Sequence, residues 1–151
     1  MLLAYRLPRE PSSPRIALWR KLKRLGVAQV LDGLVALPLD GRNREQLEWL
    51  ADEVVEAGGE STIWLGELAS AAQERVLALA MSAQVAADYS RVIAEAAAAE
   101  GEPPGQRRRT LGRLRRELRR IRARDYFPPS EREVALQALD KLSALIEEPV
   151  R

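Results

Sequence analysis

The residues best suited to chemistry in this sequence are ten arginines between positions 107 and 124, a stretch whose single acidic residue is Glu117. A guanidinium group stays charged at physiological pH, and its planar donors match a phosphate or a carboxylate. The cluster therefore indicates binding of a polyanion, with a nucleic acid as the first candidate. Eight of these arginines are candidate phosphate contacts: Arg107, Arg108, Arg109, Arg113, Arg115, Arg116, Arg119 and Arg120.

A second basic segment near the N-terminus supplies five further candidate phosphate contacts: Arg15, Arg20, Lys21, Lys23 and Arg24. Basic surface helices are common, so this segment alone is weak support for binding. Between the two segments, residues 41–106 hold twelve acidic and four basic side chains. These carboxylates leave an alternative open, in which the arginines pair within the molecule and bind no ligand.

Catalysis has little support in the composition. The 151 residues include no cysteine and no histidine, which removes thiol nucleophiles, imidazole acid–base catalysis, disulfides and most transition-metal sites. Asp32 and Asp40 could hold Mg²⁺, but neither has a second carboxylate at an obvious spacing. No glycine loop of the phosphate-binding type is present. We therefore expect a protein that is not an enzyme and uses no metal or cofactor.

Length and composition favour a folded globular protein. Hydrophobic residues make up 46% and charged residues 30% of the chain, which is ordinary for such proteins. No apolar run approaches the ~18 residues that a membrane-spanning helix needs, and the N-terminus lacks the features of a signal peptide. We expect a soluble, cytoplasmic protein without membrane contact.

The basic segment at 15–24 belongs to an N-terminal part, residues 1–68, that predicts a small sheet domain. Apolar runs predict four strands, and Asp32-Gly33 predicts a type I′ hairpin turn between the second and third. Helical spacing predicts one helix up to Gly26 and a second that is capped by Asn43. The resulting order βαββαβ is the ferredoxin-like arrangement. The three tryptophans fall in apolar stripes and are expected in the core: Trp19, Trp49 and Trp64.

The arginine cluster belongs to residues 69–151, which predict an antiparallel α-helical extension of about three helices. The Gly/Pro-rich segment 101–105 predicts a hinge between the first and second helices. The expected apolar seam of the first helix includes Val76 and Leu79, and that of the second is Leu111, Leu114, Leu118 and Ile121. The fold class is therefore α+β, a ferredoxin-like sheet domain followed by helices, one of them covered with arginine.

Several segments of the chain resemble the N-terminal domain of the ChrB chromate-resistance proteins. More loosely, the first 65 residues resemble the ferredoxin-like domain of PaaX-type repressors and of small CRISPR-associated nucleases. The segments that carry the ChrB resemblance are 5–13, 15–26, Asp32-Gly33, Leu37-Pro38, 44–50, 58–60 and Arg124-Asp125-Tyr126-Phe127.

The resemblance implies a DNA-binding transcriptional regulator associated with chromate resistance, with chromate as a possible effector and with the basic residues of 15–24 in the matching helix. We expect contacts mainly with phosphates and a homodimer. Two alternatives stay open. One is a non-catalytic interaction module that docks a separate ChrB C-terminal-type partner, because the further domain of full-length ChrB is not in this chain. The other is a degenerate metal-dependent nuclease, in which Tyr5-Arg6-Leu7 stands where related nucleases have an aspartate.

Overall fold

The computed structural model describes residues 1–147. It confirms the α+β class, with five helices and a four-stranded antiparallel sheet in the described residues. The chain divides into two compact units, a sheet unit (Met1–Ala80) and a helical unit that begins at Met81. The division lies inside a long helix, α3 (Ala71–Ala99). The sequence-based boundary at 68/69 lies close to the start of that helix, and it remains a prediction about independent folding.

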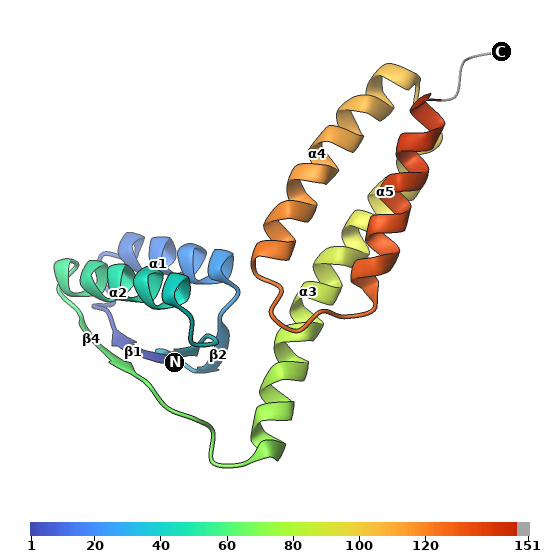
Figure 1. Ribbon diagram of the computed structural model, residues 1–151. Coiled ribbons are helices and arrows are strands. Elements are labelled where there is room, and N and C mark those ends of the chain that lie inside the picture. The colour runs from blue at the N-terminus through green and yellow to red at the C-terminus, as the bar shows by residue number, and fades with distance from the viewer. Residues whose placement is uncertain (148–151) are drawn as a thin grey trace. The chain divides into compact units, whose positions relative to one another are not determined.

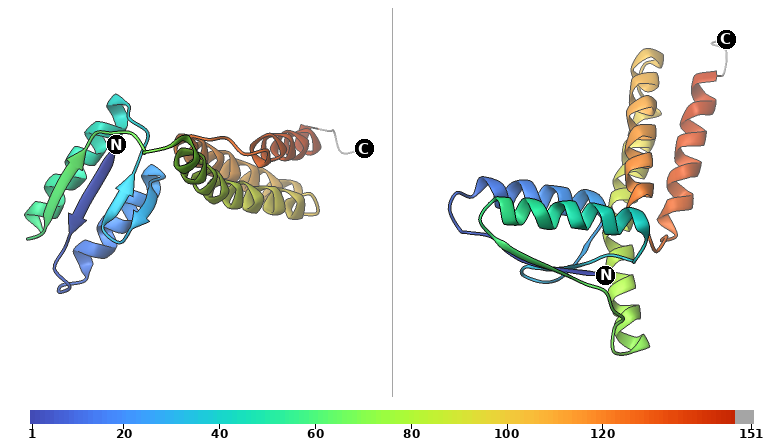
Figure 2. Two further views of the ribbon diagram at one scale, coloured as in Figure 1. Left: turned by 90° about the horizontal axis from the view of Figure 1, so that it is seen from below. Right: turned by 60° about the vertical axis from the view of Figure 1, so that its left-hand side comes forward.

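The sheet unit contains two helices that cover one face of the sheet (Figures 1 and 2). The strands are antiparallel neighbours in the order β2-β3-β1-β4. The elements follow the chain as β1 (Leu2–Arg6), α1 (Ser13–Leu25), β2 (Ala28–Leu31), β3 (Leu34–Ala36), α2 (Gly41–Glu56) and β4 (Glu60–Trp64).

The core of the sheet unit lies between the sheet and its two helices. Leu3 in β1 stands opposite Val35 in β3, and both side chains are fully buried. Leu22 of α1 and Leu47 of α2 are equally inaccessible. Burial of such aliphatic side chains contributes roughly 1.5–3 kcal/mol each, so these four positions hold the helices against the sheet.

Two local predictions in this unit are wrong. Gly33 has a positive φ of 75°, but among residues 1–147 no residue other than glycine does, so Asp32 does not adopt the conformation that a type I′ turn requires. The pairing of β2 with β3 also has a register irregularity between Gln29 and Leu31, next to this turn. The cap of α2 is Asp40 rather than Asn43, because the carboxylate of Asp40 accepts a 2.7 Å hydrogen bond from the Asn43 amide nitrogen.

The tryptophans correct a further expectation, since Trp49 and Trp64 are 55% and 59% exposed. Successive residues of a strand point to opposite faces. Ile63 is in register with the buried Leu3, so Trp64 points to the face that the helices do not cover. Trp49 lies outside the buried stripe of α2, and Trp19 is half-buried.

The helical unit is an antiparallel arrangement of three helices (Figure 1). They are the second part of α3, then α4 (Pro104–Ala123) and α5 (Glu131–Glu147). One core joins them, formed by Val85, Tyr89, Val92, Ala96 and Ala99 of α3 together with Leu111, Leu114, Leu118, Ile121, Ala135, Leu139 and Leu142. Among residues 1–147, no helix is long and apolar enough to cross a membrane.

The expected seam of α4 is confirmed, but that of α3 is wrong at its start. Val76 and Leu79 are about 70% exposed, at 69% and 70%. Alanine occurs on every side of α3, so its apolar periodicity does not select one face. The buried face is the one that carries Tyr89 and Val92, because these side chains pack in one core with residues of α4 and α5.

Candidate nucleic-acid interface

The arginines of α4 surround an apolar stripe, as the sequence predicts. Leu111, Leu114, Leu118 and Ile121 are buried, whereas most arginines of the helix are exposed. The eight candidate arginines nevertheless fall into three groups once their partners are considered.

Arg107 is held by the fold through backbone contacts. Its guanidinium donates hydrogen bonds to the backbone oxygens of Glu100 at 2.8 Å, Glu102 at 3.1 Å and Leu145 at 3.0 Å. These contacts hold the turn between α3 and α4 against the end of α5. Arg107 therefore has a structural role, and its half-buried side chain leaves it less exposed to a phosphate than its neighbours; its candidate role in phosphate binding stays a prediction.

Three further arginines have polar partners on the surface. Arg113 forms an ion pair with Glu95, Arg120 lies 3.5 Å from the carboxylate of Glu117, and Arg115 donates to Ser143 Oγ at 3.1 Å. Arg113 and Arg120 remain 54% and 70% exposed. Exposed pairs of this kind contribute less than about 1 kcal/mol, so a phosphate could displace them.

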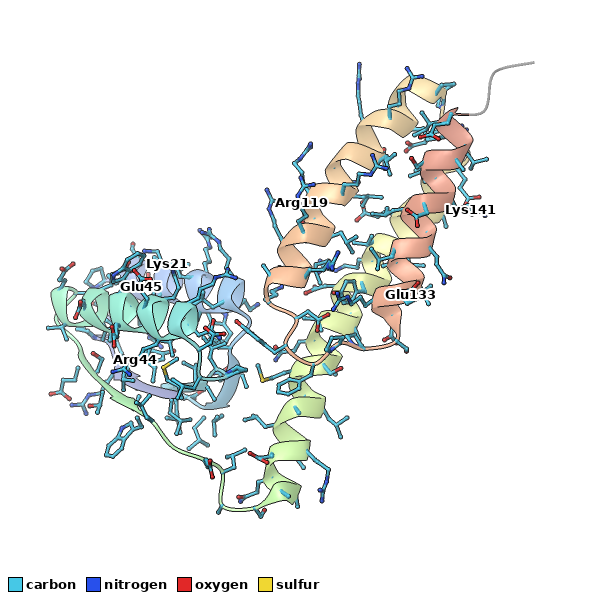
Figure 3. The ribbon with its side chains drawn as sticks, viewed as in Figure 1. Lys21, Arg44, Glu45, Arg119, Glu133 and Lys141 are labelled. Atoms are coloured by element: carbon cyan, nitrogen blue, oxygen red, sulfur yellow. The ribbon has the colours of Figure 1, made fainter. Side chains whose placement is uncertain are left out.

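Four arginines form the part of the surface that is free, and we call them the arginine face: Arg108, Arg109, Arg116 and Arg119. All four are exposed, and within residues 1–147 none of them has an ion pair or a hydrogen bond. At 1.5 Å per residue they extend over about 16 Å of α4. Figure 3 shows Arg119 projecting from the helix into solvent.

The basic residues of α1 are also divided. Lys21 is paired with Glu53 of α2, with 2.7 Å between the ammonium and the carboxylate, and Lys23 lies 5.5 Å from the ring centroid of Trp19. Arg20 and Arg24 are exposed and have no ion pair or hydrogen bond in the described part of the chain. Arg15 is exposed too. Burial raises the pKa of Tyr5, and the positive charge of Arg15 partly offsets this rise.

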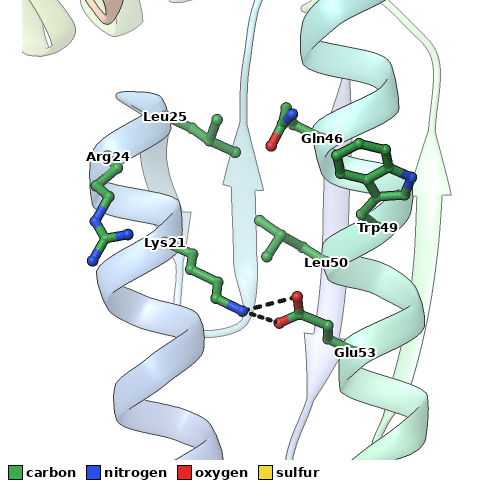
Figure 4. Close-up of a pocket in the computed structure, with 7 residues that line it drawn as sticks. All are labelled: Lys21, Arg24, Leu25, Gln46, Trp49, Leu50 and Glu53. Carbon is green, nitrogen blue, oxygen red and sulfur yellow. Dashed lines mark hydrogen bonds and ion pairs between the residues drawn. The ribbon is translucent and has the colours of Figure 1, made fainter. Parts of the chain in front are cut away.

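A groove between α1 and α2 lies beside these basic residues (Figure 4). It has a volume of about 230 Å³. Leu25 and Leu50 give it an apolar floor, and the Lys21–Glu53 ion pair crosses it. Its other lining residues are Arg24, Gln46 and Trp49.

The segment Arg124-Asp125-Tyr126-Phe127 contains a buried polar cluster that the sequence analysis did not identify. Asp125 has a fully buried carboxylate, and its Oδ2 accepts a 2.7 Å hydrogen bond from the hydroxyl of Tyr89. Arg124 is paired with Asp88 of α3 at 2.9 Å. Burial and the bond to Asp125 raise the pKa of Tyr89. The spacing of 36 residues between donor and acceptor leaves no local signal in the sequence.

No metal-ligand set accompanies these surfaces: residues 1–147 hold no group of three histidine, cysteine, aspartate or glutamate side chains that could bind one ion. Asp32, the candidate Mg²⁺ ligand in the hairpin turn, has its carboxylate 3.4 Å from the side-chain amide of Gln29.

Within residues 1–147, the chain thus combines an α+β fold with a row of exposed, unpaired arginines on one helix. Comparison with known families gives a more specific result: the family described as "Protein ChrB, N-terminal" matches residues 15–149, and the chain belongs to this family. The match confirms the resemblance found in the sequence and associates the chain with chromate resistance. No curated protein and no solved structure matches the chain significantly.

Proposed function

We propose that the chain binds DNA through the arginine face of α4, mainly by contacts with phosphates, and that it regulates transcription in chromate resistance. The observation that carries the proposal is that four exposed guanidinium groups lack an internal partner within residues 1–147. Like charges in a row repel one another, and phosphates relieve that repulsion while condensed counterions are released.

The dimensions of α4 suit a nucleic-acid backbone. Its apolar stripe is buried in the helical unit, and the residues of the arginine face are exposed on the opposite side. The arginine face extends about 16 Å, and a strand of B-DNA has one phosphate per ~3.4 Å of helix axis. About five phosphates therefore lie along the face, enough to engage all four guanidinium groups.

Family membership and the sheet unit add support of a second kind. The element order βαββαβ supports the ferredoxin-like arrangement that the sequence predicts, and the strand order is β2-β3-β1-β4. Arg20 and Arg24 of α1 would add contacts with phosphates. The nuclease alternative has no observation in its favour, since Asp32 belongs to no metal-ligand set among the described residues. No observation favours docking of a separate C-terminal-type partner either.

The test is fluorescence anisotropy of a labelled duplex, taken from upstream of the chain's own coding sequence, at a series of salt concentrations. Each neutralised phosphate contributes about −0.9 to the slope of log K against log salt. The variant Arg109→Gln/Arg116→Gln/Arg119→Gln should bind more weakly and should flatten this slope by roughly 2.7.

Arg113→Gln is the matched control, because it removes a charge of the same helix that is already paired with Glu95. It should change affinity and slope much less than the triple variant. Absence of binding by the wild-type chain even at low salt would overturn the proposal. Equal binding of a scrambled duplex would remove its regulatory part, because specific regulation requires discrimination between sequences.

A further inference from the structure

We propose that the face of α2 around Trp49 is a docking surface for the arginine face of α4 in a second copy of this chain. The inference goes beyond DNA binding and needs no nucleic acid. It names one occupant, and it arises from the α2 side of the sheet unit, to which the proposed function assigns no contact.

The first observation is the combination of an exposed tryptophan with an apolar floor. Trp49 is 55% exposed on α2, next to the groove floored by Leu25 and Leu50 (Figure 4). A large aromatic side chain in such a place is typical of the centre of a protein–protein interface, where tryptophan and arginine contribute most of the binding energy. Lys21 and Arg24 line the α1 side of the groove, so an incoming arginine would approach Trp49 from the other side of the ring, where α2 carries carboxylates.

The second observation is the charge around Trp49. Glu45, Asp52 and Glu56 lie four residues before it, three after it and seven after it, which places all four side chains on one face of α2. The three carboxylates are exposed and have no ion pair within residues 1–147. Their neighbours differ, because Glu48 is paired with Arg44 and Glu53 with Lys21. We call Glu45, Trp49, Asp52 and Glu56 the acidic face.

The acidic face and the arginine face match in length and in chemistry. Glu45 to Glu56 and Arg108 to Arg119 each cover eleven residue steps, about 16 Å along a helix. Arginine is the cation that both stacks on an indole ring and pairs with carboxylates in a planar geometry. Arg116 lies three residues from one end of its face and Trp49 four residues from one end of the acidic face, so an antiparallel pairing of the two helices brings them together.

A second copy is the occupant that this chain itself supplies. Each copy carries one acidic face and one arginine face, so a two-fold pair forms the contact twice. DNA and a second copy would then compete for the same arginines, which gives the pairing a role in controlling access to α4.

The experiment measures self-association of the nuclease-treated full chain by sedimentation velocity, at low salt and at roughly 0.5 M salt, where screening shortens the range of charge interactions to a few ångströms. The wild type should form dimers at low salt and dissociate at high salt. Trp49→Ala should weaken dimerisation about tenfold, whereas Trp64→Ala, which changes a tryptophan of similar exposure on β4, should not.

Reciprocal charge exchange makes the test specific. The variants Glu45→Lys/Asp52→Lys/Glu56→Lys and Arg109→Glu/Arg116→Glu/Arg119→Glu should each be monomeric alone, because each places like charges opposite one another. Mixed in equal amounts they should associate, because every contact between the two variants again joins opposite charges. Circular dichroism establishes that both variants are folded.

A wild type that is monomeric at every concentration overturns the inference. The same monomeric result would follow if the two faces paired within one chain, and that pairing would overturn it too. Failure of the two folded variants to associate when mixed also overturns it. Dimers that persist in the lysine variant show a different interface and reject this one. The lysine variant keeps the whole arginine face, so its binding to DNA tests the proposed function separately.

Discussion

The hydroxyl of Tyr89 donates a 2.7 Å hydrogen bond to Oδ2 of Asp125, and this contact ties the middle of α3 to the turn that leads into α5. Both groups are inaccessible to water. The family-like segment 124–127 therefore has a structural role at one end of the helical unit, beside the Arg124–Asp88 ion pair.

Tyr89→Phe should destabilise the helical unit by about 1–3 kcal/mol, because the buried carboxylate of Asp125 loses its donor. Urea unfolding followed by circular dichroism measures this. Tyr5→Phe is the control: within residues 1–147 the hydroxyl of Tyr5 makes no hydrogen bond, and the side chain is only half-buried, so a smaller change is expected. An unchanged unfolding midpoint for Tyr89→Phe would show that the bond contributes nothing.

Alkaline pH should destabilise the wild-type chain more than Tyr89→Phe. The folded pKa of Tyr89 is raised above the ordinary 10.0, so above pH 10 the unfolded tyrosine loses its proton while the folded one keeps it. The unfolded state then binds fewer protons, and the free energy of unfolding falls as pH rises. Urea midpoints measured between pH 8 and pH 11 should converge for the two proteins, and parallel curves would contradict the assignment.

Arg107→Met should cost about 1–3 kcal/mol of stability, although Arg107 belongs to an arginine-rich helix. The substitution leaves three backbone oxygens without their donor. Arg108→Met changes the neighbouring arginine, which is exposed, and should stay within about 0.5 kcal/mol. Thermal and urea unfolding of the pair distinguish the structural arginine from the surface one, and equal effects would refute the distinction.

Two valines of α3 test which side of this helix is buried. Val92 is 2% exposed and Val76 is 69% exposed. Val92→Ala should destabilise the chain by roughly 2 kcal/mol, because buried methyl groups are lost and a cavity remains. Val76→Ala should be neutral or slightly stabilising, since alanine has the higher helix propensity. A lower unfolding midpoint for Val76→Ala than for Val92→Ala would support the buried seam through Val76 that the sequence predicted.

Gly59 lies where no side chain fits. A Cβ atom there would overlap the backbone oxygen of Arg6 and come within 2.9 Å of Val54 Cγ1. Gly59→Ala should therefore destabilise the sheet unit by about 1–3 kcal/mol. Gly41→Ala meets nothing within 4 Å at the start of α2 and should be neutral or stabilising. Equal stability of the two variants, measured by urea unfolding, would mean that β1 and α2 are less closely packed than described.

Elements with a strong local pattern could be predicted from the sequence. In α4 the leucines recur at three and four among arginines, so only one side of the helix can be buried, and that side is the observed one. Four strands and two helices follow from apolar runs and from glycine at Gly26 and Gly58-Gly59. In α3 the alanines remove this contrast, and the seam through Val76 and Leu79 was wrong.

The sequence by itself determined the family, the order of the elements and the gathering of cations on α4, because each depends on residues that are close together in the chain. It could not divide the arginines by role. Arg107 and Arg108 are adjacent and chemically identical, yet one is held by the oxygens of Glu100, Glu102 and Leu145 while the other is free. Only the tertiary structure decided this, because the partners of a guanidinium group come from segments up to 38 residues away, and no local pattern records which of them folding brings within reach.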